Sequence, residues 1–288
     1  MSGNDSGGGY SIFHGTMADM TYPEVRDAAQ RGASVLWGFG VIEQHGPHLP
    51  LATDVYLPSI LLRRVKALLQ EQGILSVIMP PFYWGINRVT GIFPGSFEVR
   101  PQVMVELMVD LIKSLKKDGF AQLFCVSGHG DALHNQTLLD GIKRGAGETG
   151  IETYFIGSAG FFKRLGFAPT DPHAIAIADD DTPKSRFADV HAGRAETSSM
   201  RRYFPDIVRQ DVIAGLKSTD LGPDGLAEWR KGGQFALKTT PLGYLGDPAA
   251  SDPALGEAML AREAQLVADA IASKAKKTGA KPPSAPRF

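Results

Sequence analysis

Short apolar runs alternate with amphipathic stretches along most of the chain, and this alternation predicts an α/β fold. Runs of β-branched and aromatic residues bounded by Gly or Pro predict strands at 33–40, 74–80, 122–127 and 151–157. Apolar positions at helical spacing predict helices at 55–72, 102–117, 133–144 and 255–274. Strands joined by crossover helices form a mostly parallel sheet with helices on both faces, so we expect a three-layer α/β/α sandwich.

The predicted elements fall within a single catalytic domain at 11–272, and a chain of 288 residues suits one large α/β unit. Residues 1–10 are rich in Gly and Ser, and residues 273–288 combine Lys, Pro and Gly without an apolar face. We expect both ends to be flexible. The stretch 168–189 lacks periodicity and predicts a long loop, which in a compact domain is usually a functional lid or locally disordered.

Charge and composition narrow the classes of partner. With 30 Lys and Arg against 31 Asp and Glu, the net charge of -1 favours a small-molecule partner over nucleic acid or anionic lipid. The sequence has no long apolar run that predicts a membrane span, and its N-terminus lacks the features of a signal peptide. The single cysteine, Cys125, fits a reducing compartment, so we expect a cytoplasmic protein.

Polar residues with metal-binding side chains follow two of the predicted strands. After the first strand, Glu43 and His45 are two residues apart, and in extended backbone both side chains lie on one side. Asp54 precedes a predicted helix, where a carboxylate can cap backbone amides or bind a cation. After the third strand, His129 and Asp131 repeat the spacing beside glycines. Ligands of open α/β sheets bind beyond such strand ends.

One histidine and carboxylate pair at a strand end is more often a hydrogen-bonded turn than a metal site. Five such groups at one sheet edge favour metal, because unpaired buried charges are costly and cations compensate them. Mixed imidazole and carboxylate ligands suit zinc, manganese and iron better than magnesium or calcium. The residue types therefore predict a transition-metal or zinc site.

The segment EQHGPHLPLATD at 43–54 resembles the signature of the creatininase (creatinine amidohydrolase) family. Similar family-like segments follow in order: FPGS at 93–96, SGHG at 127–130, HAGRAETS at 191–198 and GYLGDP at 243–248. The resemblance covers roughly 15–272. It implies a creatininase-like fold and a homo-oligomer, often a hexamer.

The resemblance also implies two divalent ions per chain, zinc or manganese, with iron as an alternative. Glu43, Asp54 and His129 would bind one ion, and His45, Asp54 and Asp131 the other, with Asp54 as the bridge. Two such ions among three carboxylates leave a net positive charge, which would stabilise hydroxide. A metal-bound hydroxide can attack a carbonyl that one of the cations polarises.

Two further residues are candidates for catalysis. His191 is the expected proton shuttle, because an ordinary histidine pKa of about 6.5 suits proton uptake and return. Glu196 could orient His191, bind substrate or simply begin a helix. His48 and His134 are neighbours of proposed ligands in the sequence and are expected in supporting roles.

Candidate substrate-binding residues lie where the chain departs from many relatives. Thr90 stands where many relatives have a histidine, and Asp131 is shorter than the Glu that some carry, which would shift or weaken the second metal. The expected substrate-binding residues are Arg88, Thr90, Ser96 and Trp84. The arginine fork would suit an anionic or hydroxylated substrate.

We expect a hydrolase of a small cyclic amide, as in creatinine amidohydrolase. The family also includes a hydrolase of a cyclic diketone in inositol catabolism, so 3-dehydro-scyllo-inosose hydrolase-like cleavage of a carbon–carbon bond is an alternative. A non-catalytic, metal-stabilised binding protein is an alternative of another class. The chain has no complete G-x-G-x-x-G motif, which disfavours dinucleotide binding, and Cys125 in an apolar strand is expected to be inert.

Overall fold

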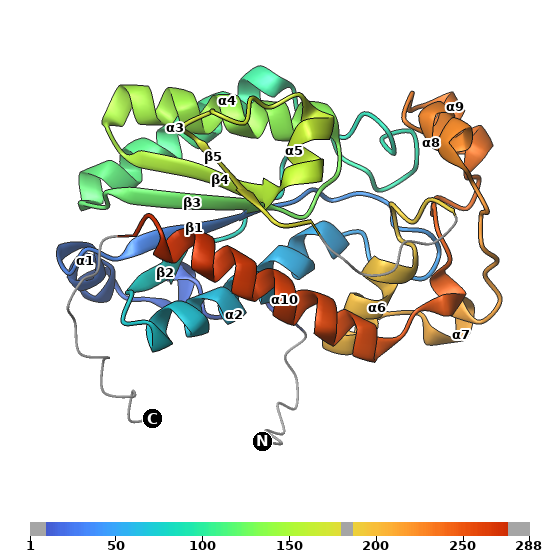
Figure 1. Cartoon of the computed structure of the whole chain (residues 1–288), viewed down its shortest axis with the longest axis horizontal. Coiled ribbons are helices and arrows are strands. Elements are labelled where there is room, and N and C mark those ends of the chain that lie inside the picture. Colours follow the sequence, from blue (N-terminus) through green and yellow to red (C-terminus); the bar gives the residue numbers. More distant parts are fainter. Residues whose placement is uncertain (1–9, 180–186, 276–288) are drawn as a thin grey trace.

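The computed structural model describes residues 10–179 and 187–275, and they form a parallel sheet between two layers of helices (Figure 1). The sheet has five strands in the order β2-β1-β3-β4-β5, and each neighbouring pair is parallel. The strands are β1 Ser34–Phe39, β2 Ser76–Ile78, β3 Gln122–Ser127, β4 Glu152–Ser158 and β5 Ala174–Ile177. The predicted three-layer α/β fold is confirmed.

Long helices cover the two faces of the sheet. One layer contains α1 (Tyr22–Gln30), α3 (Pro101–Asp118), α4 (Ala132–Thr149) and α5 (Ala159–Leu165). The other contains α2 (Thr53–Glu71) and α10 (Pro253–Ala272). All six residues of β1 are buried, with Val35 and Trp37 in the first layer's core and Leu36 in the second's. This alternation is expected for a central parallel strand.

Shorter elements gather beyond the carboxyl ends of the strands, at the right of Figure 1. The helices there are α6 (Arg194–Tyr203), α7 (Gln210–Ile213), α8 (Pro223–Trp229) and α9 (Gln234–Thr239). Three-residue 3-10 turns occur at Met17–Asp19, Pro205–Ile207 and Pro248–Ala250. A small apolar cluster that includes Leu49, Met200 and Tyr244 joins the loop after β1 to α6. This cluster fixes the loop that carries Glu43 and His45.

Most of the predicted elements are present with small shifts at their ends. The prediction of an element-free loop at 168–189 is wrong, because β5 lies within it and pairs with β4. Its four residues, alternating Ala and Ile, are too few to give a clear period. Residues 180–186 of that stretch lie outside the described residues, as do 1–9 and 276–288 of the predicted flexible ends.

Two glycines let the start of α2 approach the ends of β1 and β3. A Cβ atom at Gly40 would lie 2.2 Å from the carbonyl oxygen of Asp54, and one at Gly128 would lie 2.6 Å from the same oxygen. Any other residue at either position would push α2 away from the sheet. The two glycines therefore place Asp54 between the segments that carry Glu43 and His129.

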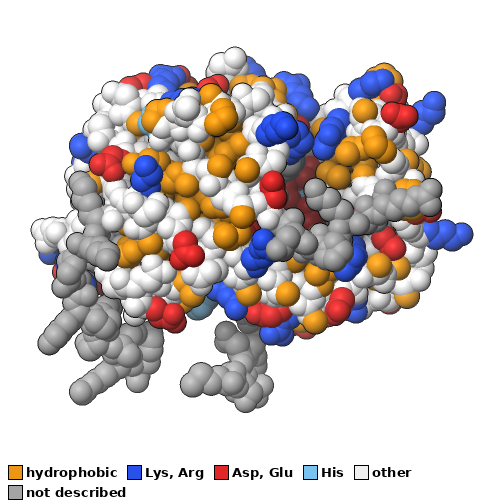
Figure 2. Space-filling model, viewed as in Figure 1, with side chains coloured by type: hydrophobic (Ala, Val, Ile, Leu, Met, Phe, Trp, Pro, Cys, Tyr) orange, Lys and Arg blue, Asp and Glu red, His pale blue; other side chains and the backbone are white. Residues whose placement is uncertain are grey.

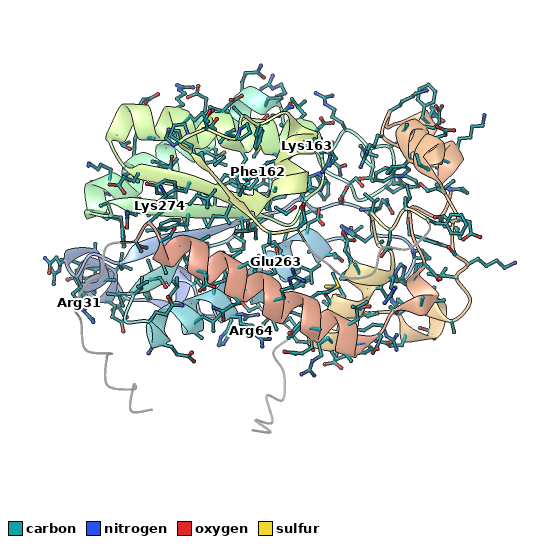
Figure 3. All side chains as sticks on the ribbon, in the orientation of Figure 1. Arg31, Arg64, Phe162, Lys163, Glu263 and Lys274 are labelled. Carbon is teal, nitrogen blue, oxygen red and sulfur yellow. The ribbon has the colours of Figure 1, made fainter. Side chains whose placement is uncertain are left out.

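An ion-pair network joins α2, α6 and α10 on the outside of the second layer. Arg64, labelled in Figure 3, lies on α2 with its Nη1 atom 2.6 Å from Oε1 of Glu257 on α10. From α6, Arg202 and Tyr203 each lie 2.9 Å from the other oxygen of Glu257. Across 10–179 and 187–275, no helix combines the length and apolarity needed to cross a bilayer.

Candidate metal centre

Six titratable side chains meet beyond the carboxyl edge of the sheet, and each comes from a segment that the fold holds in place. Glu43 and His45 lie in the loop after β1, Asp54 in the first turn of α2 and His129 directly after β3. His191 and Glu196 come from the turn before α6 and from its first turn. Glu43, His45 and Asp54 have at most 2% of their surface exposed.

Asp54 is the centre of the cluster. Its Oδ1 atom lies 3.0 Å from Nε2 of His45, and its Oδ2 atom lies 2.8 Å from Nδ1 of His129. The same Nδ1 of His129 lies 3.1 Å from Oε1 of Glu43. One carboxylate thus faces two histidines that come from different strands, which is the position of a bridging group.

The outer nitrogens of both histidines bind backbone carbonyls. Nδ1 of His45 lies 3.1 Å from the carbonyl oxygen of Glu43, and Nε2 of His129 lies 3.1 Å from that of Ile86. Each outer nitrogen must carry a hydrogen, because a carbonyl oxygen only accepts. The inner nitrogens of neutral rings would then point lone pairs at carboxylates. Either protons or metal cations must fill these positions, and histidine ligands of metals are held in this way.

The electrostatics of the metal-free cluster follow from this geometry. Burial alone would lower the pKa of His45, but the adjacent carboxylates of Asp54 and Glu43 raise it to about 9. Burial would likewise raise the pKa of Asp54, yet His45 and His129 hold it well below its usual range. The carboxylates therefore remain charged at neutral pH and attract cations.

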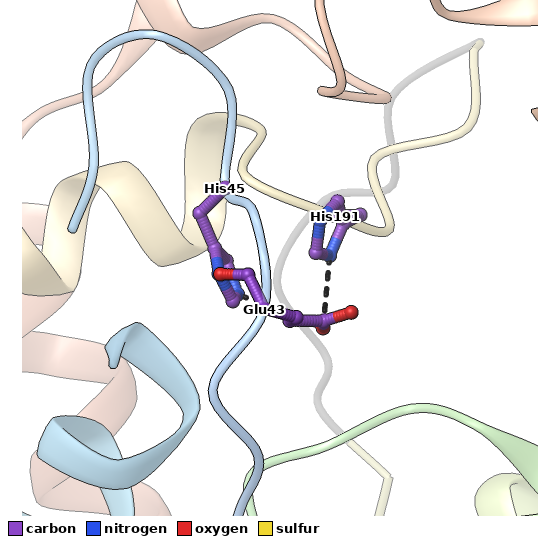
Figure 4. A group of neighbouring side chains, drawn as sticks. All are labelled: Glu43, His45 and His191. Carbon is purple, nitrogen blue, oxygen red and sulfur yellow. Dashed lines mark hydrogen bonds and ion pairs between the residues drawn. The ribbon is translucent and has the colours of Figure 1, made fainter. Parts of the chain in front are cut away.

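Three sets of side chains bring ligand atoms within 4.8 Å of one another. The sets are Glu43 with Asp54 and His129, His45 with Asp54 and Glu196, and Glu43 with His45 and His191. Figure 4 shows the last set, in which the rings of His45 and His191 flank the Glu43 carboxylate. The mixture of imidazole nitrogens and carboxylate oxygens suits zinc or manganese, so the residues present fit the expected cofactor.

The carboxylates of Asp131 and Glu196 have different partners in the structure. The Asp131 carboxylate accepts hydrogen bonds from the backbone N–H groups of His134, at 3.1 Å, and Arg88, at 3.0 Å, and so caps α4. It belongs to none of the three ligand sets within the described residues. Glu196 instead has its Oε2 atom 3.9 Å from Nε2 of His45.

A strained turn aims Glu196 at the cluster. Ala192 has a φ angle of 48°, the left-handed region that costs a non-glycine residue about 1 kcal/mol. In this conformation its backbone N–H donates to Oε2 of Glu196 at 2.6 Å. Asp189, which carried no sequence signal, accepts from the N–H groups of Arg194 and Ala195 at the start of α6. Burial raises the pKa of Glu196 to about 7.

His191 has one free nitrogen directed at the cluster. Its Nε2 atom lies 2.8 Å from the carbonyl oxygen of Gln44, to which it donates. Nδ1 lies 3.7 Å from Oε1 of Glu43. Burial lowers the pKa of His191, although Glu43 opposes this effect, so the ring is neutral at neutral pH. A neutral ring with a free Nδ1 can accept a proton.

The four expected substrate-binding residues separate into different environments. Thr90 is buried, and its hydroxyl donates to Oε2 of Glu43, so it holds a carboxylate of the cluster. Ser96 accepts from the N–H of Gln44 at 3.0 Å. Arg88 lines the cavity beside the cluster but pairs with Glu98 at 3.0 Å. Trp84 is exposed among Tyr83 and Phe97, away from the residues that line this cavity.

A cavity of about 260 Å³ opens next to the cluster. Figure 2 shows a hollow with acidic side chains in its depth and basic side chains at its rim. It is lined by Trp229, Arg164 and Arg230, none of which carries a sequence signal. They lie on, or directly after, short helices without a motif or a clear period, so only their position in space connects them with the site.

The remaining histidines and the cysteine lie outside the ligand sets. His48 pairs with the Thr197 hydroxyl at 2.9 Å, and Nδ1 of His134 accepts from the N–H of Ile86 at 3.3 Å. Burial lowers the pKa of both rings. Burial also raises the pKa of the Cys125 thiol well above its usual range, which disfavours a thiolate nucleophile.

Comparisons with known proteins identify the family of the chain. Residues 18–271 match the family described as "Creatininase: Creatinine amidohydrolase". A mycofactocin precursor peptide peptidase from Mycolicibacterium smegmatis is 27% identical over 82% of this chain and 83% of its own length. The creatinine amidohydrolase of Pseudomonas putida is 24% identical over 91% of this chain and 96% of its own length. A 3-dehydro-scyllo-inosose hydrolase from Thermotoga maritima matches over only 34% of its length.

Solved structures show the same fold. A crystal structure of creatinine amidohydrolase superposes with a TM-score of 0.67 at 20% identity, covering 90% of this chain and 97% of that one. Two similar structures are described as "Creatininase Mn" and as a mutant of "Zn-Zn type". The structural likeness supports the fold, and the sequence match places the family.

Proposed function

The chain belongs to the creatininase (creatinine amidohydrolase) family and is a metal-dependent hydrolase, and we propose that it cleaves an amide bond with two divalent cations. Amide cleavage is the chemistry shared by the names of its amidohydrolase and peptidase relatives. A small cyclic amide is our first candidate substrate, because a creatinine amidohydrolase is among the relatives that match most of the chain. The partial match to the inosose hydrolase gives the ring-ketone alternative little support.

The proposed ligands follow the geometry of the cluster. Glu43, Asp54 and His129 would hold one cation, and His45, Asp54 and Glu196 the other. Zinc or manganese fits this donor set, and both metals occur in the descriptions of related structures. Bound cations of this kind polarise a carbonyl and make water acidic enough to act as a nucleophile near neutral pH. The protein supplies the positions of these ligands and the route of the proton.

His191 is the proposed carrier of that proton. Its Nε2 hydrogen bond to the Gln44 carbonyl fixes the ring, so Nδ1 faces the cluster beside Glu43. Because its pKa is lowered, the neutral ring can take a proton at pH 7 and return it to the amine that leaves. Thr90 and Gln44 keep Glu43 and His191 in place during this transfer.

The observation that carries the proposal is the single carboxylate of Asp54 held between two oriented histidines. The test is turnover by His191→Gln protein loaded with zinc or manganese, on creatinine, other cyclic amides and N-acyl dipeptides. We expect the wild type to hydrolyse one of these classes and the variant to be at least ~10²-fold slower with unchanged metal content. Equal rates would contradict the role of His191, and no turnover by metal-loaded wild type would contradict amide hydrolysis.

Two further properties concern the whole protein. A cytoplasmic location fits the single buried thiol of Cys125, and a homo-oligomer fits the family. The native mass in solution tests the second property directly.

A further inference from the structure

Two arginines from separate elements meet at the mouth of the cavity beside the metal cluster. Arg164 lies on α5, which follows β4, and Arg230 directly follows α8. Both line the cavity that also contains Glu43, Asp54 and His129. We propose that Arg164 and Arg230 bind an oxyanion group of the substrate, so that the enzyme acts on amides that carry a carboxylate or a phosphate. This inference rests on the proposed amide hydrolysis.

The two guanidinium groups lie close enough to repel each other. Loss of solvent lowers the pKa of both arginines, and the charge of Arg230 lowers the pKa of Arg164 further, whereas the charge of Asp131 opposes this shift. Like charges held at one opening are unfavourable unless an anion lies between them. Arg88, the third arginine on the cavity wall, is already paired with Glu98. Within 10–179 and 187–275, no carboxylate lies within 4.0 Å of either Arg164 or Arg230.

Among the described residues, 10–179 and 187–275, few groups use the hydrogen-bonding capacity of the two arginines. Arg164 donates one Nη2 hydrogen bond to the carbonyl oxygen of Gly130, at 3.1 Å, and stacks over the ring of Phe161 at 4.9 Å. These contacts fix its plane beside the loop that carries His129. Guanidinium groups bind carboxylate and phosphate through pairs of parallel N–H groups, which a fixed plane favours.

The acidic groups near the arginines also have other partners. Both oxygens of Asp131 accept backbone hydrogen bonds, and Glu43, Asp54 and Glu196 belong to the proposed ligand sets. With two divalent cations bound, the cavity would be positive at its base and at its mouth. Such a cavity attracts a substrate with a negative charge and repels a cationic one.

The wall between the cluster and the arginines is largely apolar. Trp229 places its ring 5.9 Å from that of His191, and its Nε1 atom is bound to the Thr240 hydroxyl at 3.0 Å. Val89, Leu133 and Val190 line the same cavity. A substrate with its amide at the cations and its anion at the arginines would thus pass a short apolar section, which favours compact molecules.

The test compares binding of three probes to zinc-loaded protein by calorimetry. N-acetylglycine carries a carboxylate, N-acetylglycinamide is its neutral analogue, and acetamidomethylphosphonate carries a phosphonate. We expect wild type to bind an anionic probe at least ~10-fold more tightly than the neutral one, and Arg164→Gln/Arg230→Gln to lose this preference. The matched control is Lys163→Gln/Lys231→Gln, which removes the same charge from exposed neighbours and should keep it.

The probes also separate the sources of the anion. A preference for N-acetylglycine supports a carboxylate substrate, and a preference for the phosphonate supports a phosphorylated one. Equal binding of all three by wild type, or an acid preference that survives in the double arginine variant, would overturn the proposal. Because zinc content is measured on each sample, a metal-free protein would instead contradict the proposed function and leave the arginine site to be judged from its own binding data.

Discussion

Whether a carboxylate near the cluster can bind a metal ion depends on the hydrogen-bond donors that it already contacts. Asp131 follows His129 in the sequence, and Glu196 follows His191. The Asp131 carboxylate accepts hydrogen bonds from two backbone N–H groups, whereas the Glu196 carboxylate faces His45. A carboxylate that already accepts two such bonds gains less from a cation. The geometry therefore favours Glu196 over Asp131 as the ligand, although the sequence resemblance implied the reverse.

Substitution of each carboxylate by the amide of the same shape distinguishes the role of Glu196 from that of Asp131. We expect Glu196→Gln to lower the metal content of the purified protein by about one ion per chain, because one set loses a charged ligand. Asp131→Asn should keep both ions and lose some thermal stability, since its amide caps α4 less well. Elemental analysis and thermal unfolding of both variants give the answer. Loss of metal from Asp131→Asn but not from Glu196→Gln would show that Asp131 is the metal ligand, as the family resemblance implies.

The pH dependence of the metal-free fold follows from His45. Its pKa of about 9 exceeds the ordinary histidine value near 6.5, so its ion pair with Asp54 contributes stability that is fully present below pH 6.5. That contribution is lost as the pH rises through 9. We expect the Tm of chelator-treated protein to fall between pH 6.5 and 9.5, whereas zinc-loaded protein should change much less. A metal-free Tm that rises over this interval would contradict the description of the cluster.

The sequence identified most of the candidate metal ligands, but it did not identify the arginines that line the cavity. Glu43, His45, Asp54 and His129 belong to two short segments at the ends of predicted strands, which placed them at one sheet edge, and the family resemblance grouped them as metal ligands. Arg164 lies on the short helix α5 and Arg230 directly follows α8, both outside any motif. No local pattern could show that these residues face one cavity, because their meeting depends on how the chain packs after β4 and before α9.

At the scale of elements, the sequence predicted the long helices and missed short elements whose formation depends on tertiary packing. The helices α2, α3, α4 and α10 have 18 to 20 residues each, which is long enough for the helical spacing of their apolar residues to be recognised in the sequence. The four residues of β5 and the four of α7 are shorter than a recognisable pattern. The strand β5 is stabilised by pairing with β4 at the sheet edge, and α7 is stabilised by packing of Ile213 in the apolar cluster that includes Met200.

The crossing of α10 with α6 offers an element-scale test. A Cβ atom at Gly256 would lie 2.5 Å from the carbonyl oxygen of Ser198, so Gly256→Ala should separate the helices and destabilise the protein by ~1–3 kcal/mol. Gly147→Ala on α4 is the matched control, since that position is exposed and nothing lies within 4 Å of the added carbon. There the better helix propensity of Ala should preserve or raise stability. Thermal unfolding of the two variants compares them, and equal Tm values would refute the close crossing.

On the scale of the whole molecule, the sheet and its two helix layers act as a frame for groups that repel one another. Three carboxylates and three histidines are brought together at the strand ends, with two arginines at the opening. Protons on the histidines or bound metal cations make this concentration of buried acid favourable. The family to which the chain belongs consists of metal-dependent hydrolases, which fits this arrangement.

The most direct test of this account is the metal content of protein purified without chelators, measured by elemental analysis beside the Asp54→Ala variant. Because Asp54 lies between both proposed ligand sets, we predict about two zinc or manganese ions per wild-type chain and a loss of at least one in the variant. The variant must retain its fold, which circular dichroism verifies. Wild-type protein that binds neither metal after supplementation, or a variant with undiminished content, would contradict a binuclear centre bridged by Asp54.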